Sequence, residues 1–526
     1  MLISAPKSIT CSVANNLRQY ISPLTSYWPV ALLVLISICV LFWRLGQGSL
    51  LDWDEAVYAQ VSKEMLRSGS WLTPLWEYKN WFHKPPLFIW TTAIFYWLFE
   101  VNEFWSRAAS AFSGVALIVV TYLIGKVVYD KGTGFLSAVI LLASYAFVMH
   151  ARFGTMDIML TLYIYLSIYA YLHVREGKQK WWYAFWFSCA LAIMTKGAAG
   201  LVAPLTVAVA LPLDKGLIDT LRSRYFWYGF LLAFLIAAPW HVFMYLQHGE
   251  QFINGYFVYH IVARAATAIE GATGGHTYYL EVLQQQFFPW SYLAPFALAF
   301  SLIDSIKGQS RSRILLLVAV VVFSLYTLIA TKLPWYIIPL YPALAVLTAA
   351  LLARAFKHSE PIAFSGLLVA VFALAVVAPV KIVLVFGVAG VLMMLLMLLK
   401  RKLTYRPVVL LMSAFLITVG LNNLRTLYNK KDEPTAELAR IVASTTPEDR
   451  EALIVYDSDI HPTPLFYSDR PILNARTPED LSRYIKDYRI KGIILRKESI
   501  DSLLRIYNLH VHAEAGSFVY ATYTTR

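Results

Sequence analysis

The stretch YWPVALLVLISICVLFWRLGQGSLLDWDEAVYA, residues 27–59, begins with an apolar run and ends in a cluster of carboxylates. Tyr27–Trp43 has the length and composition of a membrane-spanning helix. Asp52, Asp54 and Glu55 follow it closely. Carboxylates beside a bilayer are costly to desolvate, so such a cluster at the mouth of a span indicates a site that faces a substrate or an ion. A solvated loop end would have the same residues, and the cluster alone does not separate the two.

The whole chain has the composition of a polytopic membrane protein. Of its 526 residues, 58% are hydrophobic and 15% are charged, and the mean hydropathy is +0.56. A formal net charge of +13 would suggest nucleic acid as the partner of a soluble protein, but most Lys and Arg stand in short loops between apolar runs. We therefore exclude nucleic acid. Three cysteines, two of them in apolar segments, predict neither a disulfide framework nor a thiolate metal site.

Apolar runs of spanning length predict an all-α membrane domain of about thirteen helices over residues 1–424. The runs lie at residues 27–43, 105–126, 132–150, 156–173, 181–196, 198–213, 225–246, 288–305, 312–330, 335–356, 361–378, 381–399 and 406–424. The shorter apolar run Pro86–Phe99 is predicted to lie along the membrane interface, because counting it as a span would place the basic loops outside. The N-terminus is then cytoplasmic, and two long loops, about 44–104 and 247–287, lie outside.

After the last span the sequence changes to ordinary soluble composition. Pro434–Ser444 and Thr477–Tyr488 predict helices, the second with an N-cap Thr, Pro at the first helical position and acids in the first turn. Ala452–Asp457 and Ile490–Leu495 predict strands. Residues 425–526 are thus predicted to form a small α/β domain. It is extracytoplasmic, because an odd number of spans from a cytoplasmic N-terminus ends outside.

This topology gathers unusual polar residues on the outer face. Besides the acidic cluster, the outer loops and turns contain Lys84, Arg152, Asp157, Lys196, His248, His260, Arg264, His276, Glu281 and Lys332. Carboxylates and several cations at membrane level suit an anionic lipid headgroup, best a phosphate, that is attacked by a hydroxyl or an amine. Lys84, Arg264 and Lys332 would bind the phosphate through charge-assisted hydrogen bonds, and a carboxylate would act as the base.

Several motifs together resemble the signature of one superfamily. The matching stretches are LDWDEAVYA at Leu51–Ala59, HKPP at His83–Pro86, Asp157, TKG at Thr195–Gly197 and KLPWYIIP at Lys332–Pro339. They resemble the aminoarabinose transferases and protein O-mannosyltransferases, which are polyprenyl-phosphate-sugar glycosyltransferases of the GT-C fold. The resemblance covers roughly residues 25–350, and the layout of spans with an outer C-terminal domain resembles the aminoarabinose transferase branch. Each motif alone is weak, and the combination is specific.

The resemblance implies a role for each matched residue. Asp54 would be the principal catalytic carboxylate, with Glu55 beside it and Asp157 as a second acidic partner. The implied ligands of the donor phosphate are Lys84, Arg264, Lys332, Tyr336 and Tyr58. His83 stands where close aminoarabinose transferases are expected to have Glu, which leaves open the sugar and the binding of a divalent metal ion. His83 and His260 are the candidate metal ligands.

The implied protein is an inverting glycosyltransferase of the bacterial inner membrane with an extracytoplasmic active site. It would take a sugar, aminoarabinose or a related one, from polyprenyl (undecaprenyl) phosphate and transfer it to lipid A or another envelope glycolipid. The same chemistry with a protein Ser or Thr hydroxyl as acceptor remains open. A transporter or flippase for a lipid-linked anion is less favoured. It would need ionisable residues at mid-membrane and a repeat relating two halves, whereas the charges here cluster at one interface.

Overall fold

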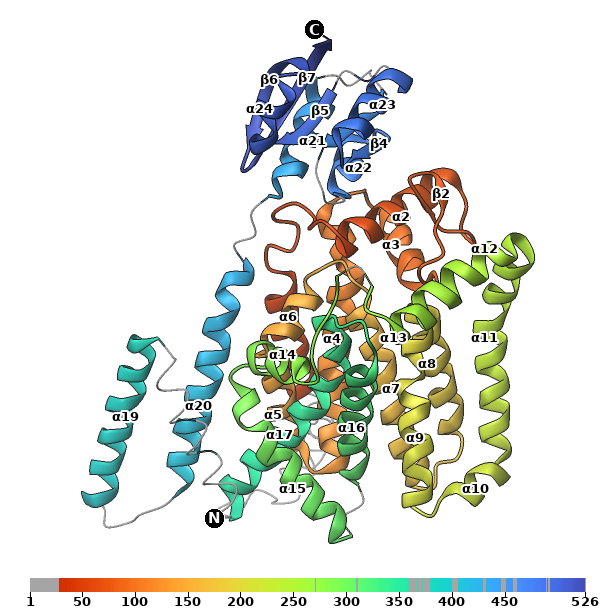
Figure 1. The fold of residues 1–526 in the computed structure, drawn as a ribbon. Helices are drawn as coiled ribbons and strands as arrows, with labels where there is room; N and C mark the ends of the chain where they lie inside the picture. Colours follow the sequence, from red (N-terminus) through yellow and green to blue (C-terminus); the bar gives the residue numbers. More distant parts are fainter. Residues whose placement is uncertain are drawn as a thin grey trace, which may run out of the picture.

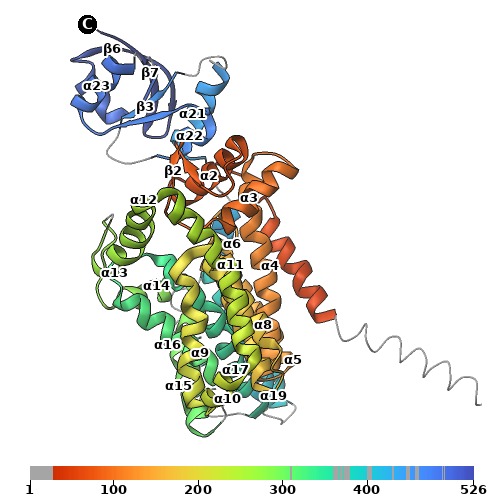
Figure 2. The same ribbon diagram turned by 90° about the vertical axis from the view of Figure 1, so that its right-hand side faces the viewer.

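The computed structural model describes residues 28–525 apart from 270, 309–310, 359–366, 368–370, 372–378, 400–404, 429–431, 446–450, 457–460, 489 and 491. It has two parts, a bundle of long helices and an α/β domain stacked on one end of the bundle (Figure 1). The view turned by 90° shows the same stacking (Figure 2). We call the end of the bundle that carries the α/β domain the domain end. The predicted helical domain and small C-terminal sheet domain are both confirmed.

Several described stretches are long and apolar enough to cross a membrane. They are α4 (Glu103–Val128), α7 (Asp157–Arg175), Trp181–Leu213, α11 (Arg224–His248) and Pro334–Phe356. The stretch Trp181–Leu213 is made of α8 (Trp181–Lys196), the 3-10 helix η1 (Gly197–Leu201) and α9 (Val202–Leu213). At its start the Trp181 ring lies 4.5 Å from that of His173, and just past its end Asp214 pairs with Arg175 at 3.3 Å. Both contacts are at the C-terminal end of α7. The chain therefore folds back at η1, so α8 and α9 run in opposite directions, and that each is a separate span stays a prediction.

The predicted span 132–150 is not one straight helix. It consists of α5 (Lys131–Leu142) and α6 (Tyr145–Ala151), which are bent by 70° at the break. Ser144 has extended backbone angles, φ −94° and ψ 125°, and its hydroxyl donates to the Ile140 carbonyl at 2.7 Å, a local bond that competes with the helix. After the bend, Arg152 donates to the carbonyls of Val40 and Leu41 at 3.1 and 2.9 Å. Arg152 thus ties α6 to the first helix.

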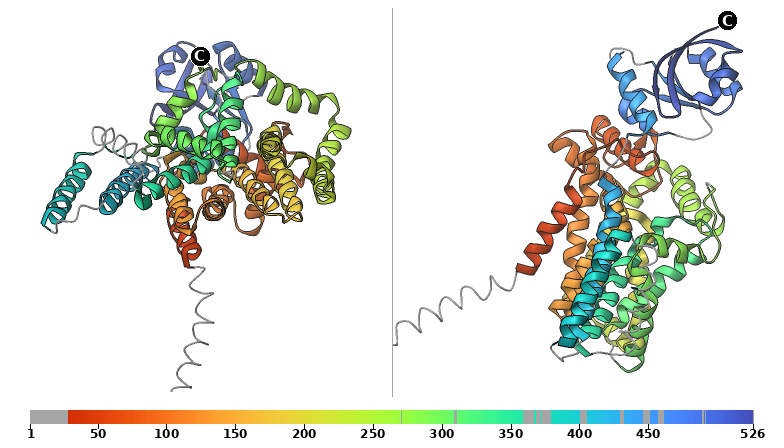
Figure 3. Two further views of the ribbon diagram at one scale, coloured as in Figure 1. Left: turned by 90° about the horizontal axis from the view of Figure 1, so that it is seen from below. Right: turned by 90° about the vertical axis from the view of Figure 1, so that its left-hand side faces the viewer.

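Helices also occupy the remaining predicted spans that the structure describes. They are Trp28–Phe42, α15 (Ala294–Ile306), α16 (Arg313–Leu328), α19 (Val380–Leu399) and α20 (Tyr405–Asn423), and α17 (Tyr341–His358) forms most of the stretch Pro334–Phe356. α20 contacts α17, whereas α19 contacts α20 and lies to one side of the bundle (Figures 1 and 3). The predicted span 361–378 falls almost wholly on residues outside those described, so the number thirteen stays a prediction.

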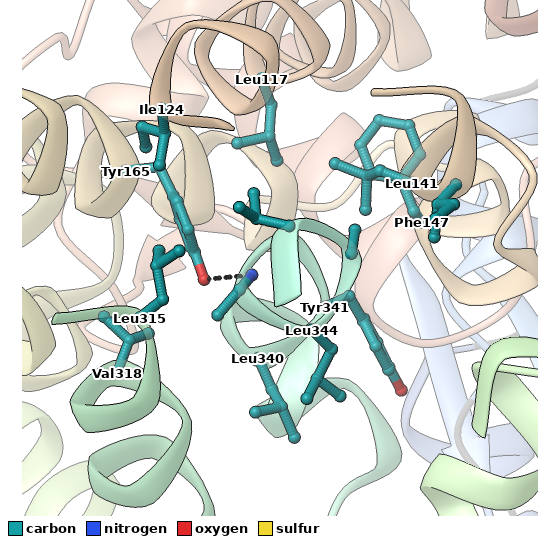
Figure 4. Close-up of a cluster of buried hydrophobic side chains, with 14 of the residues drawn as sticks. Leu117, Ile124, Leu141, Phe147, Tyr165, Leu315, Val318, Leu340, Tyr341 and Leu344 are labelled. Atoms are coloured by element: carbon teal, nitrogen blue, oxygen red, sulfur yellow. Dashed lines mark hydrogen bonds between the residues drawn. The ribbon is translucent and has the colours of Figure 1, made fainter. Parts of the chain in front are cut away.

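The centre of the bundle is a cluster of buried side chains around α17 and the 3-10 helix before it, η4 (Pro334–Leu340) (Figure 4). Tyr165 of α7 is fully buried there. Its hydroxyl donates to the Pro339 carbonyl at 2.8 Å and accepts from the Ala343 amide at 2.8 Å. Leu315 and Val318 of α16 pack in the same cluster. This packing fixes η4, which carries Tyr336, against α7.

The two predicted outer loops have structure of their own at the domain end. The first contains α2 (Asp54–Ser68), the hairpin β1 (Leu75–Trp76) and β2 (Lys79–Asn80), and α3 (Leu87–Leu98). The second contains α12 (Glu250–Phe252), the π-helix η2 (Ile253–Ala263), α13 (Arg264–Ala266) and α14 (Tyr278–Gln286). α10 (Leu217–Arg222) and the 3-10 helix η3 (Trp290–Tyr292) are short connectors. α3 contacts α2 and α4, and α2 and α3 lie next to the α/β domain (Figure 1). That α3 lies in a membrane interface remains a prediction.

The C-terminal domain follows the 3-10 helix η5 (Leu424–Tyr428) and has a five-stranded sheet of order β4-β3-β5-β7-β6. The strands are β3 (Leu453–Tyr456), β4 (Ile472–Ala475), β5 (Gly492–Arg496), β6 (Tyr507–Ala515) and β7 (Phe518–Thr525). The first three pair in parallel and the last two are antiparallel. The helical pieces are α21 (Pro434–Thr445), α22 (Thr463–Ser468), α23 (Pro478–Tyr488), η6 (Lys497–Ser499) and α24 (Ile500–Leu503). The predicted helices and strands are confirmed, including the cap in which Thr477 accepts from the Asp480 amide at 3.1 Å.

Candidate active site

The ends of several helices meet at the domain end of the bundle. Asp54 is the first residue of α2, Asp157 is the first of α7, and Lys196 is the last of α8. Arg264 begins α13, directly after η2, and Lys84 lies in the loop before α3. A cavity of about 420 Å³ opens there. Its polar lining is His83, Lys84, Lys196, Tyr256, His260, Arg264, Tyr326 and Tyr336, and its apolar wall includes Leu201, Val202, Leu205, Leu325 and Ile329.

Two carboxylates, Asp157 and Asp54, lie beside this cavity, the first in an ion pair and the second hydrogen-bonded to a tyrosine. Asp157 is paired with Lys196, and the two side chains are only 6% and 10% exposed. Asp54 accepts a hydrogen bond from the buried hydroxyl of Tyr58. Burial raises the pKa of Asp54 above its ordinary value; Lys196 and Lys84 oppose this rise and Asp157 adds to it. A carboxylate with a raised pKa is a stronger base than an exposed one, so Asp54 is suited to accept a proton.

Three cations surround the cavity. The Arg264 guanidinium donates to the Tyr336 hydroxyl at 3.3 Å, and the Lys196 ammonium lies 5.5 Å from the centre of the Tyr336 ring. Burial, together with Lys196 and Arg264, lowers the pKa of Lys84 to about 7, although Asp54 and Asp157 oppose the shift. Cations crowded in this way gain from a bound anion, which would restore the charged form of Lys84.

Tyr58 was predicted among the phosphate ligands, and the structure joins it to Asp54 instead. Its side chain is 3% exposed, and burial and the neighbouring carboxylates Asp54 and Asp157 raise the pKa of the phenol well above its ordinary value. The hydroxyl therefore stays protonated and can only donate to the carboxylate of Asp54. This bond orients the Asp54 side chain.

Glu55 is buried against Arg107 and is not among the residues that line the cavity, so we propose a structural role for it in place of the predicted catalytic one. Its carboxylate pairs with Arg107 at 2.8 Å, and the two side chains are 2% and 0% exposed. It also accepts the amides of Leu51 at 2.8 Å and Gly154 at 2.9 Å. Glu55 therefore fastens α2 to α4 and to the turn before α7. An Arg inside a predicted apolar span needs a buried partner, and that signal could have identified the pair.

Lys332 does not reach the cavity either. Its ammonium donates to the carbonyls of Tyr326 at 3.0 Å, Thr327 at 2.5 Å and Ile329, at the C-terminal end of α16. A lysine has three N–H donors, and these bonds use them. We therefore propose that Lys332 caps the C-terminal end of α16, in place of its predicted role as a phosphate ligand.

His83 and His260 come together as predicted, with ring centroids 4.0 Å apart, but the site does not fit a divalent metal ion. Burial and the nearby Lys84 and Arg264 lower the pKa of His83 to about 3, so a positive charge is disfavoured at this position. In the part of the chain that the structure describes, no group of three His, Cys, Asp or Glu residues could hold a metal. The adjacent cations would also repel one. We derive no step through a metal.

Lys196 has no role predicted from the sequence, yet it lines the cavity and pairs with Asp157. The turn after it depends on Gly197, which has a φ of 59° and lies against the Tyr256 hydroxyl, where a Cβ would collide. Tyr256 is also 3.3 Å from His241 Nε2. The Lys-Gly pair was the available signal, because a tight turn that cannot accept a side chain often presents its neighbour to a ligand.

The chain is similar to several known proteins. Residues 31–249 match the dolichyl-phosphate-mannose-protein mannosyltransferase family. An uncharacterized protein of Aquifex aeolicus (strain VF5) is 29% identical over 497 residues, which are 93% of this chain and 95% of that protein. An undecaprenyl phosphate-alpha-4-amino-4-deoxy-L-arabinose arabinosyl transferase of Shewanella sediminis is 28% identical over 323 residues, 60% of this chain and 58% of that enzyme. The chain spans about three-fifths of the length of the arabinosyl transferases it matches.

The fold matches a crystal structure of ArnT from Cupriavidus metallidurans bound to undecaprenyl phosphate. The TM-score is 0.71 at 22% identity, and the match covers 94% of this chain and 98% of that one. The chain therefore has the GT-C fold of that multi-pass membrane enzyme. Within that fold class it is ArnT-like, in sequence as well as in fold. The resemblance found in the sequence motifs is thereby confirmed.

Proposed function

We propose that this chain transfers a sugar from undecaprenyl phosphate to an acceptor at the domain end of the bundle. The observation that carries the proposal is one cavity lined by Lys84, Lys196 and Arg264 on one side and by apolar residues of α9 and α16 on the other. A lipid phosphate needs cations to bind its headgroup and an apolar surface to bind its tail. The names of the relatives support undecaprenyl phosphate as the carrier and aminoarabinose or a related sugar as the cargo.

In the proposed reaction, the acceptor oxygen attacks the anomeric carbon from the side opposite the phosphate. The new bond joins the acceptor oxygen to that carbon, the bond from the carbon to the phosphate oxygen breaks, and the anomeric configuration inverts. Asp54 takes the acceptor proton, held in place by Tyr58. The phosphate leaves with one more negative charge than it had in the donor, and Lys84, Lys196 and Arg264 stabilise that charge. No general acid is required for this leaving group.

We infer that the domain end faces the periplasm and that the protein lies in the bacterial inner membrane. The argument is the positive-inside rule applied to the basic loops at the opposite end. Cysteines introduced at Ser70 and Ser482 should react with an impermeant maleimide in cells whose outer membrane has been permeabilised. A cysteine at Lys178, an exposed residue in the basic loop between α7 and α8, is the matched control and should react only after lysis. Reaction in the reverse order would reject the orientation.

The acceptor is proposed to be lipid A or another envelope glycolipid. The match of residues 31–249 to the protein mannosyltransferase family supports a protein hydroxyl as the second candidate. Mass spectrometry of lipid A and of envelope proteins from a deletion strain decides between them, because only the true acceptor should lose a sugar and regain it on complementation. The donor is tested directly by sugar transfer from an undecaprenyl-phosphate sugar in nanodiscs. Transfer by the parent protein and none by Asp54→Asn is the expected result.

A further inference from the structure

Asp52 is an acidic residue of the first loop that the proposed reaction does not use, and the C-terminal domain holds it. Its Oδ1 accepts the amide of Thr463 at 3.0 Å. Its Oδ2 lies 2.9 Å from Nδ1 of His461 and accepts the Thr435 hydroxyl at 3.2 Å. Thr435 and Thr463 are buried, and the Asp52 and His461 side chains are each 13% exposed. This is a packed contact between the two parts of the molecule, unlike a solvated ion pair at a surface.

The residues just before Asp52 are bonded to the same domain. The amide of Ser49 donates to Asp432 Oδ1 at 2.7 Å, and the Ser49 hydroxyl accepts the amide of Glu433 at 2.7 Å. The amide of Leu50 donates to the Tyr467 hydroxyl at 2.8 Å. The C-terminal domain therefore holds the main chain over Ser49–Asp52 at several points, through side chains that come from different parts of its sequence.

Trp53 separates Asp52 from Asp54 and has an unfavourable backbone conformation, with a φ of 78° and a ψ of −137°. A residue with a Cβ keeps such angles only when the chain on both sides is held. The Trp53 side chain is 59% exposed and so contributes little to holding itself. On the C-terminal side, Glu55 is fixed by Arg107. On the N-terminal side, Arg107 also holds the Ser49 carbonyl at 2.6 Å, but the carboxylate of Asp52, the residue next to Trp53, is held by the C-terminal domain.

We propose that the C-terminal domain positions Asp54 for catalysis. By holding Asp52, it maintains the strained turn at Trp53, and that turn aims the Asp54 carboxylate toward the cavity. Asp52 and His461 are then positioning residues. The inference deepens the proposed function, since it rests on Asp54 as the base of that reaction. It also gives the C-terminal domain a role in the catalytic step, separate from binding of the donor by Lys84, Lys196 and Arg264, which lie on other elements.

The test uses the full-length protein with His461→Ala and Asp52→Asn. Each variant should lower kcat about tenfold to a hundredfold, the scale of a misplaced catalytic group, while the donor KM and the Kd for undecaprenyl phosphate stay within about twofold. His461→Asn retains an N–H near the position of Nδ1 and should recover most of the rate. Hydrogen exchange of a peptide that covers residues 49–57 should be faster in His461→Ala than in the parent.

The matched control is Arg67→Ala. Arg67 lies at the far end of α2 and makes another contact with the C-terminal domain, an ion pair with Asp469 at 2.8 Å. This variant should leave both kcat and the exchange of residues 49–57 unchanged. Unchanged kcat in both His461→Ala and Asp52→Asn overturns the inference, and so does an equal loss in Arg67→Ala. If the parent transfers no sugar, the proposed function fails, whereas the exchange of residues 49–57 still decides whether the domain holds the turn.

Discussion

Two buried acids at the domain end, Glu55 and Asp54, differ in how completely the protein satisfies their charges. Glu55 and Arg107 are 2% and 0% exposed, and the guanidinium also donates to the main-chain carbonyls of Leu45 at 2.9 Å and Ser49 at 2.6 Å. Asp54 and Lys84 lie beside the cavity, where burial raises the pKa of the acid and lowers the pKa of the base to about 7. An acid and a base whose charges are satisfied by partners stabilise the fold. An acid and a base with shifted pKa values beside a cavity are suited to bind a substrate or react with it.

Removing the charge of Asp54 should have the largest effect on the reaction. Asp54→Asn keeps the size of the side chain and loses the base, so transfer should slow by about two to four orders of magnitude. The thermal midpoint in detergent should match that of the parent, because the fold does not depend on this charge. The measurement is sugar transfer from an undecaprenyl-phosphate donor in nanodiscs. Near-normal turnover would contradict the assignment of Asp54 as base.

Changes to Glu55 and Arg107 should instead affect the stability of the fold more than the rate of transfer. Arg107→Ala leaves the Glu55 carboxylate buried without its partner, which should cost about 3–5 kcal/mol of the free energy of unfolding. Glu55→Gln should destabilise the protein less, since its one remaining carbonyl oxygen still accepts one of the two amides, Leu51 or Gly154, that bind separate oxygens of Glu55, and it should slow transfer less than Asp54→Asn does. Thermal unfolding of purified protein measures the first effect. An unchanged midpoint in Arg107→Ala would show that this pair does not hold the fold.

Loss of one cation from the cavity should weaken donor binding without unfolding the protein. Lys84→Ala and Arg264→Ala should each cost about 1.5–3 kcal/mol in the Kd for undecaprenyl phosphate, the range for a hydrogen bond to a charged group. Lys332→Met is the matched control, because Lys332 caps α16 outside the cavity. It should lower the thermal midpoint and leave the Kd unchanged in the protein that remains folded. Equal weakening by Lys332→Met would restore Lys332 as a phosphate ligand.

The pH dependence should be the smallest effect and the most specific one. Asp54 acts as a base only when deprotonated, so transfer should rise with pH through its raised pKa. Lys84 binds phosphate when protonated, so kcat/KM should fall as pH increases through about 7. Lys84→Arg keeps its charge at every accessible pH and should abolish the alkaline fall. An alkaline fall that persists in Lys84→Arg would assign it to another group.

Part of the site could be predicted because topology alone brings distant loops to one end of the bundle. Asp54, Lys84, Asp157 and Arg264 each follow or precede a strong apolar run, so their side of the membrane could be worked out from the basic loops. The small α/β domain was predictable for another reason, since its strands and capped helices have ordinary local signals.

The rest depended on information that is not local. Asp54 and Glu55 are adjacent on a helix, so their side chains point about 100° apart. The position of Arg107 shows that Glu55 is the one buried in the protein core. The break in the predicted span 132–150 comes from Ser144, one small residue in an apolar run. Lys196 became a site residue through its pairing with Asp157, which comes from another helix.

The three cations around the cavity also bear on what happens after the sugar has left. The carrier phosphate that remains has one negative charge more than the donor, so the same positive field should hold the spent carrier more tightly than the loaded one. Turnover would then be limited by product release, and added undecaprenyl phosphate should compete with the donor at concentrations below the donor KM. A site built to stabilise its leaving group in this way needs a means of clearing the spent lipid from the membrane.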